Sequence, residues 1–438
     1  MARIAFIGAG SLVFARRLIA DILSFPELKE ATFALMDIDA KRLDYTRRVA
    51  DRIVREGGSP AQVEVTTDRR EALRGADYVI TMFQVGALEV IRHDIEIPLK
   101  YGVDQCIGDT LGPGGVFRSL RTIPVMVDIC RDMEEICPDA WLLNYTNPMA
   151  MNCWAVNKTS GVRNVGLCHS VQGTAQWLSA LAGVPDEHRN EVSHWVAGIN
   201  HQSWFLELRW KGQDLYPVLR SKIDEQAVYN LDTTRFEMLK HLGYFPTESS
   251  GHNSEYLPWF RKRPEILRKY TPGGGWNGGT GFILQLYGRD REDEEKELER
   301  MASGEEPLNL KRSEEYGSYI IHSLETGTPC RINGNVANTG LITNLPEGCC
   351  VEVPCYVDKH GINPCFVGDL PPHLAAINRS NIAVQELAVR AALDADRDMA
   401  FYAVALDPLT AAALSLEEIR QMVDEMFKAE AEWLPYFA

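Results

Sequence analysis

A cysteine and two histidines lie at the predicted ends of strands. Cys168 and His169 close the strand-like run Asn164 to Cys168, and the carboxyl ends of strands form the ligand-binding edge of doubly wound folds. His201 closes Gly198-Ile199-Asn200-His201, which follows the next strand-like segment. A thiolate together with an imidazole suits a divalent transition metal. Cys168 and His201 are therefore candidate metal ligands, and the alternative is a buried thiol beside a hydrogen-bonded histidine.

A glycine-rich turn follows the first apolar run of the chain. Gly8-Ala9-Gly10-Ser11 lies between the strand-like Arg3 to Ile7 and the helical spacing of Leu12 to Leu23. Glycines in such a turn let the backbone approach a pyrophosphate, and the helix N-terminus supplies amide donors. Asp37 ends the next strand-like run, where a carboxylate can hold ribose hydroxyls and disfavours a 2′-phosphate. The predicted NAD-binding residues are Gly8, Gly10, Ser11 and Asp37. The alternative is a tight turn without a ligand.

Three further polar stretches could contribute to a site. Asp109 lies in a glycine-rich loop, Gly108 to Gly115, and could line a pocket or cap the following helix. Asn147 follows a predicted strand and could bind substrate hydroxyls or cap the helix after Pro148. Thr247 to Tyr256 combines polar and aromatic residues without periodicity. Such loops often line sites, although a solvated surface loop has the same composition.

The elements that must position these residues alternate between strand and helix patterns. Short apolar runs separated by amphipathic stretches occupy the first 195 residues, and this alternation predicts a Rossmann-like, doubly wound parallel sheet in an α/β fold. After residue 195 the pattern becomes mixed. We expect an NAD-binding domain at 1–195 and a mixed α/β catalytic domain at 196–438. No Ser/Pro-rich linker separates them, so they should pack tightly.

The composition of the chain argues against several classes of protein. The 438 residues carry 45 Lys and Arg against 61 Asp and Glu, a formal net charge of −16, which argues against nucleic acid and anionic membrane surfaces as partners. No apolar run approaches the roughly 18 residues that span a bilayer. The first residues resemble a signal peptide only faintly, because the apolar stretch ends at Gly8 and no cleavage site is evident. The ten cysteines indicate reduced thiols. We therefore expect a cytoplasmic protein.

Taken in order, these segments resemble the NAD- and metal-dependent family 4 glycoside hydrolases, and within that family the α-galactosidase branch. The match runs along essentially the whole chain. The branch carries Cys-His-Ser-Val at its metal site, which is Cys168-His169-Ser170-Val171 here. Leu242 to Phe245 and Thr247 to Ser250 also fit it, as does the C-terminal Val351-Glu352-Val353-Pro354-Cys355.

The resemblance implies NAD as a catalytic cofactor that is not consumed, and Mn²⁺ held by Cys168 and His201. It implies hydrolysis of small α-galactosides by oxidation at C3, proton removal at C2, elimination of the aglycone, addition of water and return of the hydride. The family scheme departs from the usual pair of carboxylates. Its catalytic positions correspond to Tyr256 as the base, Asp109 as its modulator and His169 as the acid, and its substrate-binding positions to Asn147 and Arg92. Relatives form dimers or tetramers, so a homodimer or homotetramer is expected.

Three other interpretations remain open at this point. An α-galacturonidase or α-glucuronidase of the same family needs a cation for the sugar carboxylate, and Arg118, Arg121 or Arg261 could supply it. An NAD-dependent hydroxy-acid dehydrogenase would share the glycine-rich turn without needing the Cys168–His201 pair. A non-catalytic NAD sensor would need neither Tyr256 nor His201.

Overall fold

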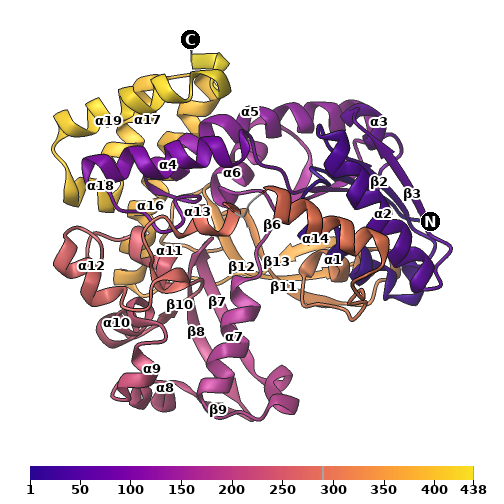
Figure 1. Cartoon of the computed structure of the whole chain (residues 1–438). Helices are drawn as coiled ribbons and strands as arrows, with labels where there is room; N and C mark the ends of the chain where they lie inside the picture. The colour runs from indigo at the N-terminus through magenta and orange to yellow at the C-terminus, as the bar shows by residue number, and fades with distance from the viewer. Residues whose placement is uncertain (289–290, 438) are drawn as a thin grey trace.

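One sheet runs through the molecule in the computed structural model, which describes residues 1–288 and 291–437. The strands of the described residues lie in the order β10-β8-β7-β12-β11-β6-β5-β4-β1-β2-β3, with β13 beside β12 and β9 beside β8. Figure 1 shows helices on both sides of this sheet. The N-terminus and the C-terminal helices lie on opposite sides of the molecule.

The first half of the chain forms the parallel part of the sheet. Its six strands follow the order 3-2-1-4-5-6, which is that of dinucleotide-binding α/β folds. They are β1 (Arg3–Ile7), β2 (Thr32–Met36), β3 (Gln62–Thr66), β4 (Tyr78–Thr81), β5 (Trp141–Asn144) and β6 (Arg163–Leu167). The predicted doubly wound parallel sheet is therefore confirmed.

Helices cover both faces of the parallel strands because alternate strand residues point to opposite sides. On β1, Ile4 and Phe6 lie in one apolar cluster with Leu18, whereas Ala5 and Ile7 lie in another with Ile129. The helices of this half are α1 (Leu12–Leu23), α2 (Ala40–Glu56), α3 (Arg69–Leu73), α4 (Ala87–Tyr101), α5 (Gly112–Ile136), α6 (Met149–Thr159) and α7 (Ser170–Leu181).

Strands from the second half extend the same sheet with antiparallel pairing. They are β7 (Ser193–Ile199), β8 (Gln202–Trp210), β9 (Gln213–Asp214), β10 (Phe245–Pro246), β11 (Cys330–Ala337), β12 (Cys350–Asp358) and β13 (Gly361–Pro364). β11 pairs with β6, and β12 pairs with β7. The two sequence halves thus share one sheet, and the division at residue 195 stays a prediction.

The remaining helices fall into two groups by their order in the chain, and the second group forms a layer over α5. The first group is α8 (Tyr216–Lys222), α9 (Gln226–Tyr229), α10 (Thr233–Leu242), α11 (Ser250–Glu255), α12 (Pro264–Tyr270), α13 (Phe282–Tyr287), α14 (Arg291–Ser303) and α15 (Tyr316–Thr326). The second is α16 (Pro372–Asp394), α17 (Arg397–Leu406), α18 (Pro408–Ala413) and α19 (Leu416–Ala429). Phe117 of α5, Val384 of α16 and Met422 of α19 share an apolar cluster.

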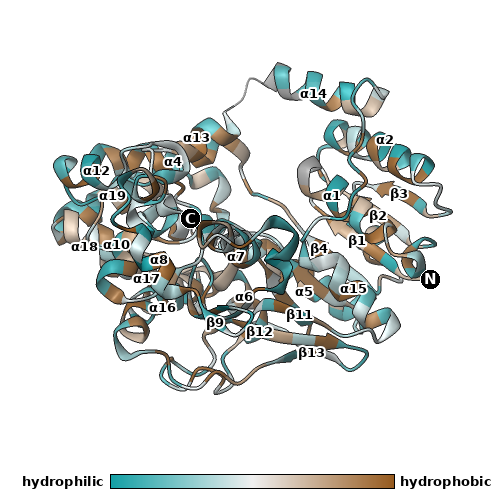
Figure 2. Cartoon of the chain, turned by 90° about the horizontal axis from the view of Figure 1, so that it is seen from below, coloured by the Kyte–Doolittle hydropathy of each residue, from teal (hydrophilic) through white to brown (hydrophobic). Residues whose placement is uncertain are grey.

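The outer surface is polar. Figure 2 shows the hydrophilic helix α14 beside α2 at the rim of the molecule, with the hydrophobic residues gathered along the sheet. None of the described helices combines the length and the hydropathy that crossing a bilayer requires. The ten cysteines are free thiols, as expected.

Candidate active site

Cys168 and His201 meet where the parallel and antiparallel parts of the sheet join. Cys168 follows β6, and His201 occupies the turn between β7 and β8. A third residue, Glu248, comes from the segment between β10 and α11. One ligand atom from each of the three lies within 4.8 Å of the other two. The structure therefore brings the two predicted ligands together and adds a carboxylate that sequence reasoning missed.

Two of these three residues hold a backbone conformation that side chains other than glycine rarely adopt. The φ angle is +64° at His201 and +69° at Glu248. Left-handed conformations are unfavourable for L-residues and cluster at functional sites, where the surrounding fold enforces them. His201 Nε2 lies 3.6 Å from Glu248 Oε2. The strained turns thus aim an imidazole and a carboxylate at each other.

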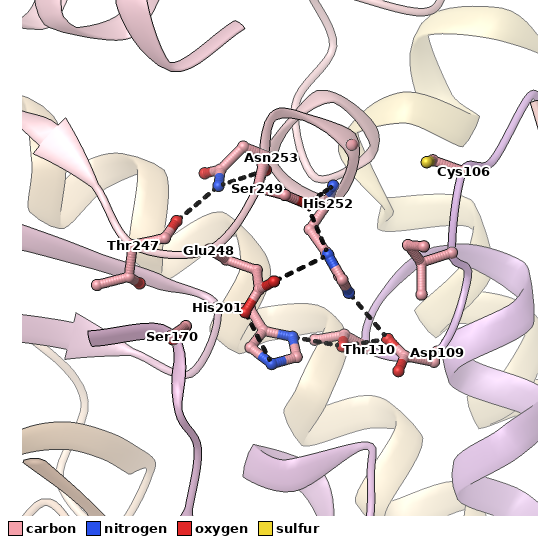
Figure 3. A network of polar contacts seen from close by, with 12 residues as sticks. Cys106, Asp109, Thr110, Ser170, His201, Thr247, Glu248, Ser249, His252 and Asn253 are labelled. Carbon is pink, nitrogen blue, oxygen red and sulfur yellow. Dashed lines mark hydrogen bonds and ion pairs between the residues drawn. The ribbon is translucent and has the colours of Figure 1, made fainter. Parts of the chain in front are cut away.

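His252 connects this cluster with Asp109. Its Nδ1 lies 3.3 Å from Glu248 Oε1, and its Nε2 lies 3.5 Å from Asp109 Oδ1. Figure 3 shows the ring between the two carboxylates, beside the ring of His201. Burial lowers the pKa of His252, but the charge of Glu248 and the hydrogen bond to Asp109 outweigh it, so the pKa is raised. Sequence reasoning missed His252, although it lies within the polar stretch that was singled out.

Asp109 and Asn147 face each other across the site. Asn147 Nδ2 donates to Asp109 Oδ2 at 2.9 Å. Burial opposes the ionised form of Asp109, yet His252 and the charge of Arg118 hold its pKa well below the usual range. Neither residue caps a helix, because the N-cap positions of α5 and α6 are Leu111 and Pro148. The capping alternatives for both are therefore wrong.

Tyr256 is buried at the end of α11 and points at the same imidazole. Its Oη lies 3.4 Å from His201 Nδ1, and Thr110 Oγ1 lies 2.9 Å from that nitrogen. Burial, followed by the charges of Glu255 and Asp109, raises the pKa of Tyr256 well above its ordinary value. A tyrosine in this position serves as a base only when a nearby cation favours the phenolate.

The segment that supplies Glu248, His252 and Tyr256 is not the loop that we expected. Residues 250–255 form the helix α11, which Ser249 caps by accepting from His252 N at 3.4 Å. All six residues of α11 are buried. The surface-loop alternative is therefore wrong, because the polar groups of this segment turn inward and find partners in the cluster.

Two predicted site residues lie outside this cluster. His169 is exposed at the N-cap of α7, on the wall of a cavity of about 620 Å³ that Arg17 and Glu315 also line. Arg92 is exposed on α4 and forms an ion pair with Glu96 at 3.3 Å. The structure does not bring either side chain into contact with Asp109, His201 or Tyr256.

The glycine-rich turn has the shape that a dinucleotide needs. A Cβ on Gly8 would lie 2.7 Å from Phe83 Cβ, and one on Gly10 would lie 2.7 Å from Asp37 Oδ2. Gly10 N donates to the same Asp37 oxygen at 2.7 Å. Only glycine fits at position 8, where the neighbours are the Cβ and backbone of Phe83 and φ is +91°. Asp37 therefore lies against the turn at the N-terminus of α1, and the residues present fit NAD.

The donor set around Cys168 fits a divalent transition metal. It combines a thiol, an imidazole and a carboxylate, a mixture that suits such ions. Burial, with the charges of Glu248 and Glu352, raises the pKa of the Cys168 thiol well above its ordinary value. A second triad, Asp109, His201 and His252, also has its ligand atoms within 4.8 Å of one another. The two triads share His201.

Curated relatives match the chain over its full length. The chain is 43% identical to an alpha-galactosidase of Bacillus subtilis (strain 168) over 446 residues, covering all of both proteins. It is also 43% identical to an alpha-galactosidase of Rhizobium meliloti (strain 1021), covering all of this chain and 90% of that one. An alpha-galacturonidase of Lachnoclostridium phytofermentans is 29% identical, covering 99% of this chain and 97% of that one.

Solved structures share the fold. The Bacillus subtilis protein lplD superimposes with a TM-score of 0.87 at 27% identity, covering 97% of this chain and 99% of that one. A 6-phospho-alpha-glucosidase from gut microorganisms, solved with NAD and Mn²⁺, gives a TM-score of 0.83 at 20% identity and covers 99% of each chain.

Family models account for most of the chain. Residues 3–184 match the family 4 glycosyl hydrolase model, and residues 196–410 match its C-terminal domain. With these matches and the full-length relatives, the chain belongs to the family 4 glycosyl hydrolases.

Proposed function

We propose that this protein is an NAD- and Mn²⁺-dependent α-galactosidase that hydrolyses terminal α-D-galactosides. The observation that carries the proposal is the convergence of Cys168, His201 and Glu248 with Tyr256 and Asp109 at one edge of the dinucleotide-binding sheet. The names of the 43% identical relatives support the choice of sugar.

The charges around the site support a neutral sugar over a uronate. Of the three arginines that could have paired with a sugar carboxylate, Arg121 is bound by Asp94 and Glu430, and Arg261 by Asp104. Arg118 donates to Asn147 O at 3.3 Å and acts on Asp109. Two of these three guanidinium groups thus already have acidic partners, and Arg118 is the one left to meet a sugar carboxylate.

Cys168, His201 and Glu248 would hold the metal, and Gly8, Gly10, Ser11 and Asp37 the dinucleotide. When bound, NAD supplies an acceptor for the hydride on the sugar C3, and the metal supplies a Lewis acid for the neighbouring sugar oxygens. Both groups thereby make the proton on C2 more acidic.

Tyr256 is positioned to remove that proton. Its phenol oxygen would accept the C2 proton, and the electron pair left on C2 would expel the glycosidic oxygen from C1. His169 would donate a proton to the leaving oxygen, Asn147 would bind sugar hydroxyls, and Asp109 would modulate Tyr256. Water then adds at C1, and the reverse proton transfers restore Tyr256 and His169. The hydride would return to C3, so that NAD is not consumed. Arg92, which is exposed on α4 and paired with Glu96, would contact substrate as the family resemblance implies.

Hydrolysis of p-nitrophenyl glycosides by the reduced protein tests the proposal. We expect release from the α-galactoside only with NAD and Mn²⁺ together, and little from the α-glucoside or the α-galacturonide. Tyr256→Phe should lower kcat by roughly 10²–10⁴-fold, the usual contribution of a positioned base, with NAD affinity unchanged. Tyr229→Phe, which removes a phenol bonded to Glu237 outside the cluster, is the matched control.

Other outcomes would select another function. Release from the uronide alone would keep the chemistry and assign an α-galacturonidase. No release from any glycoside, with stoichiometric NADH formed from a hydroxy acid, would favour a dehydrogenase. NAD binding without any reaction would favour the sensor.

We also propose that the enzyme works in the cytoplasm as a homodimer or homotetramer. Its ten free cysteines support a reducing compartment, since a thiolate ligand is lost on oxidation. Sedimentation of the reduced protein measures its mass in solution. The mass of a single chain would contradict the oligomer.

A further inference from the structure

Thr110 lies in the polar cluster, in the loop between α4 and α5, and it takes no part in the proposed reaction. Its side chain is buried. Its Oγ1 lies 2.7 Å from Asp109 Oδ1 and 2.9 Å from His201 Nδ1. One hydroxyl thus links the carboxylate on its own loop to the imidazole in the β7–β8 turn (Figure 3).

The partners of Asp109 fix the direction of these hydrogen bonds. Asn147 Nδ2 donates to one oxygen of Asp109, and His252 Nε2 faces the other. An ionised carboxylate only accepts hydrogen bonds, and a hydroxyl has a single proton to donate. The proton of Thr110 therefore goes to Asp109. Its two lone pairs can only accept, and they face the Nδ1 of His201 and the phenol of Tyr256. With both of these groups as donors, His201 carries a proton on Nδ1.

We propose that Thr110 is a positioning residue that holds His201 in the Nδ1–H tautomer, so that the Nε2 lone pair is presented to the metal. A neutral imidazole has one protonated and one free nitrogen. In metal sites, the hydrogen bond at one ring nitrogen selects which nitrogen binds the ion. With Nδ1 committed to Thr110, the free nitrogen is Nε2, which faces Glu248 at 3.6 Å.

This assignment decides between the two triads that share His201. The Cys168–His201–Glu248 triad can use Nε2, the nitrogen that Thr110 leaves free. On the other edge of the ring, both Thr110 Oγ1 and Tyr256 Oη lie close to Nδ1, at 2.9 and 3.4 Å. That edge is therefore reserved for hydrogen bonding. The Asp109–His201–His252 group serves as the supporting network.

The backbone around Thr110 is held rigidly enough for this role. Glu255 accepts hydrogen bonds from three successive amides, those of Cys106, Ile107 and Gly108, at 2.6 to 3.0 Å. A Cβ on Gly115 would lie 2.5 Å from Thr110 C, so the first turn of α5 packs directly against the Thr110 backbone. The loop is thus fixed from both sides, and Thr110 cannot follow His201 if that ring turns.

The inference rests on the proposed metal-dependent function, and its first test is a measurement on the metal-free wild-type chain. Selective ¹⁵N labelling of histidine, with the His201 signal assigned by its absence from His201→Asn, reports which ring nitrogen carries the proton. We expect a proton on Nδ1, whereas Nε2, which faces the Glu248 carboxylate at 3.6 Å, can also carry one until an ion displaces it. An unprotonated Nδ1 would overturn the proposal without any variant at position 110.

The second test compares Thr110→Val with Thr110→Ser. Val keeps the shape and removes the hydroxyl, whereas Ser restores it. Removing such a hydrogen-bonding partner of a metal ligand typically weakens metal binding by about 10- to 100-fold. We expect that loss in the Val variant, measured as Mn²⁺ affinity by electron paramagnetic resonance, and an affinity within about threefold of wild type in the Ser variant.

The two failures can be told apart. Wild-type Mn²⁺ affinity and an unchanged His201 tautomer in Thr110→Val would overturn the role of Thr110 and leave the proposed function intact. A wild-type chain that binds no Mn²⁺ would overturn the proposed function, and the role of Thr110 with it. Should Thr110→Val fail to fold, the wild-type tautomer and the Ser variant still decide the question.

Discussion

Single side chains in the cluster differ in the protonation state that their burial favours. Burial raises the pKa of the Cys168 thiol, and the charges of Glu248 and Glu352 raise it further. Glu352 itself is buried on β12, where its Oε2 accepts from Ser203 Oγ at 2.7 Å. The raised pKa values therefore keep both groups protonated at pH values where a free carboxyl has already ionised and a free thiol begins to ionise.

Metal binding at Cys168 should release a proton. The thiol is protonated near neutral pH because its pKa is raised, whereas only the thiolate is a ligand. We expect about one proton released per Mn²⁺ bound, and affinity that rises with pH. Titration calorimetry in buffers of different ionisation enthalpy measures this. Cys365→Ser, which alters a half-buried thiol after β13, should release the same number, and proton release unchanged in Cys168→Ser would refute the assignment.

Glu352 should make the protein less stable as the pH rises. Burial raises its pKa from 4.5 to about 7, against the hydrogen bond from Ser203. The folded state therefore holds the proton more tightly than the unfolded state. Its contribution to the free energy of unfolding is complete below about pH 4.5 and is lost as the pH rises through about 7, by up to roughly 3 kcal/mol.

Glu352→Gln removes this titration. Urea unfolding between pH 5 and pH 8 should show the variant gaining stability over wild type as the pH increases. Glu187→Gln, at an exposed position, should run parallel to wild type. A difference between Glu352→Gln and wild type that does not change with pH would show that the carboxyl is ionised throughout.

At the scale of elements, the β7–β8 turn combines a proposed metal ligand with an unfavourable backbone conformation. His201 holds a φ of +64° between two antiparallel strands, where two-residue turns favour Asn and Gly. A left-handed conformation costs an ordinary L-residue roughly 1–2 kcal/mol. This turn therefore holds a histidine at a position whose backbone conformation favours Asn or Gly.

His201→Asn should separate function from folding. Asn tolerates the left-handed region, so relief of strain offsets the lost contacts and stability should change by about 1 kcal/mol or less. Mn²⁺ binding should be lost. Lys211→Asn is the matched control, since Lys211 has a φ of +49° in the turn after β8, and it should leave metal binding intact. Unfolding of His201→Asn at room temperature would refute this separation.

The elements that depend on local pattern were predictable, and the contacts between distant segments were not. The first six strands and the turn at Gly8 follow from apolar runs and glycines, and Cys168 and His201 from their places after strands. The partners Glu248, His252 and Thr110 lie on segments whose sequences give no sign of where they meet. The insertion of β11 and β12 between β6 and β7 was also missed, because antiparallel pairing over such separations leaves no periodic trace in either strand.

At the scale of the whole molecule, one sheet joins both halves of the chain. β6 at the end of the first half pairs with β11, which begins at Cys330. Without that partner, the edge of β6 would expose unpaired backbone groups. The sheet therefore ties the stability of each half to the presence of the other.

The full chain should unfold as one unit in spite of the proposed division at residue 195. Calorimetry should show a single transition for the wild type. A fragment of residues 1–195 expressed alone should aggregate through its open edge, and mixing it during refolding with residues 196–438 should restore the native circular dichroism. Two separate transitions, or a monomeric and folded 1–195 fragment, would contradict this expectation.

The order of the strands also determines when, during synthesis of the chain, Cys168 and His201 can be brought together. Cys168 and His201 follow β6 and β7, but β11 and β12 lie between those strands in the sheet and end at Asp358. At about 5–20 residues per second, the ribosome needs on the order of 10 seconds to travel from His201 to Asp358. During that interval the thiol and the imidazole have no framework to hold them together. Capture of the proposed metal by these two residues therefore has to wait until β11 and β12 have been made and have joined the sheet.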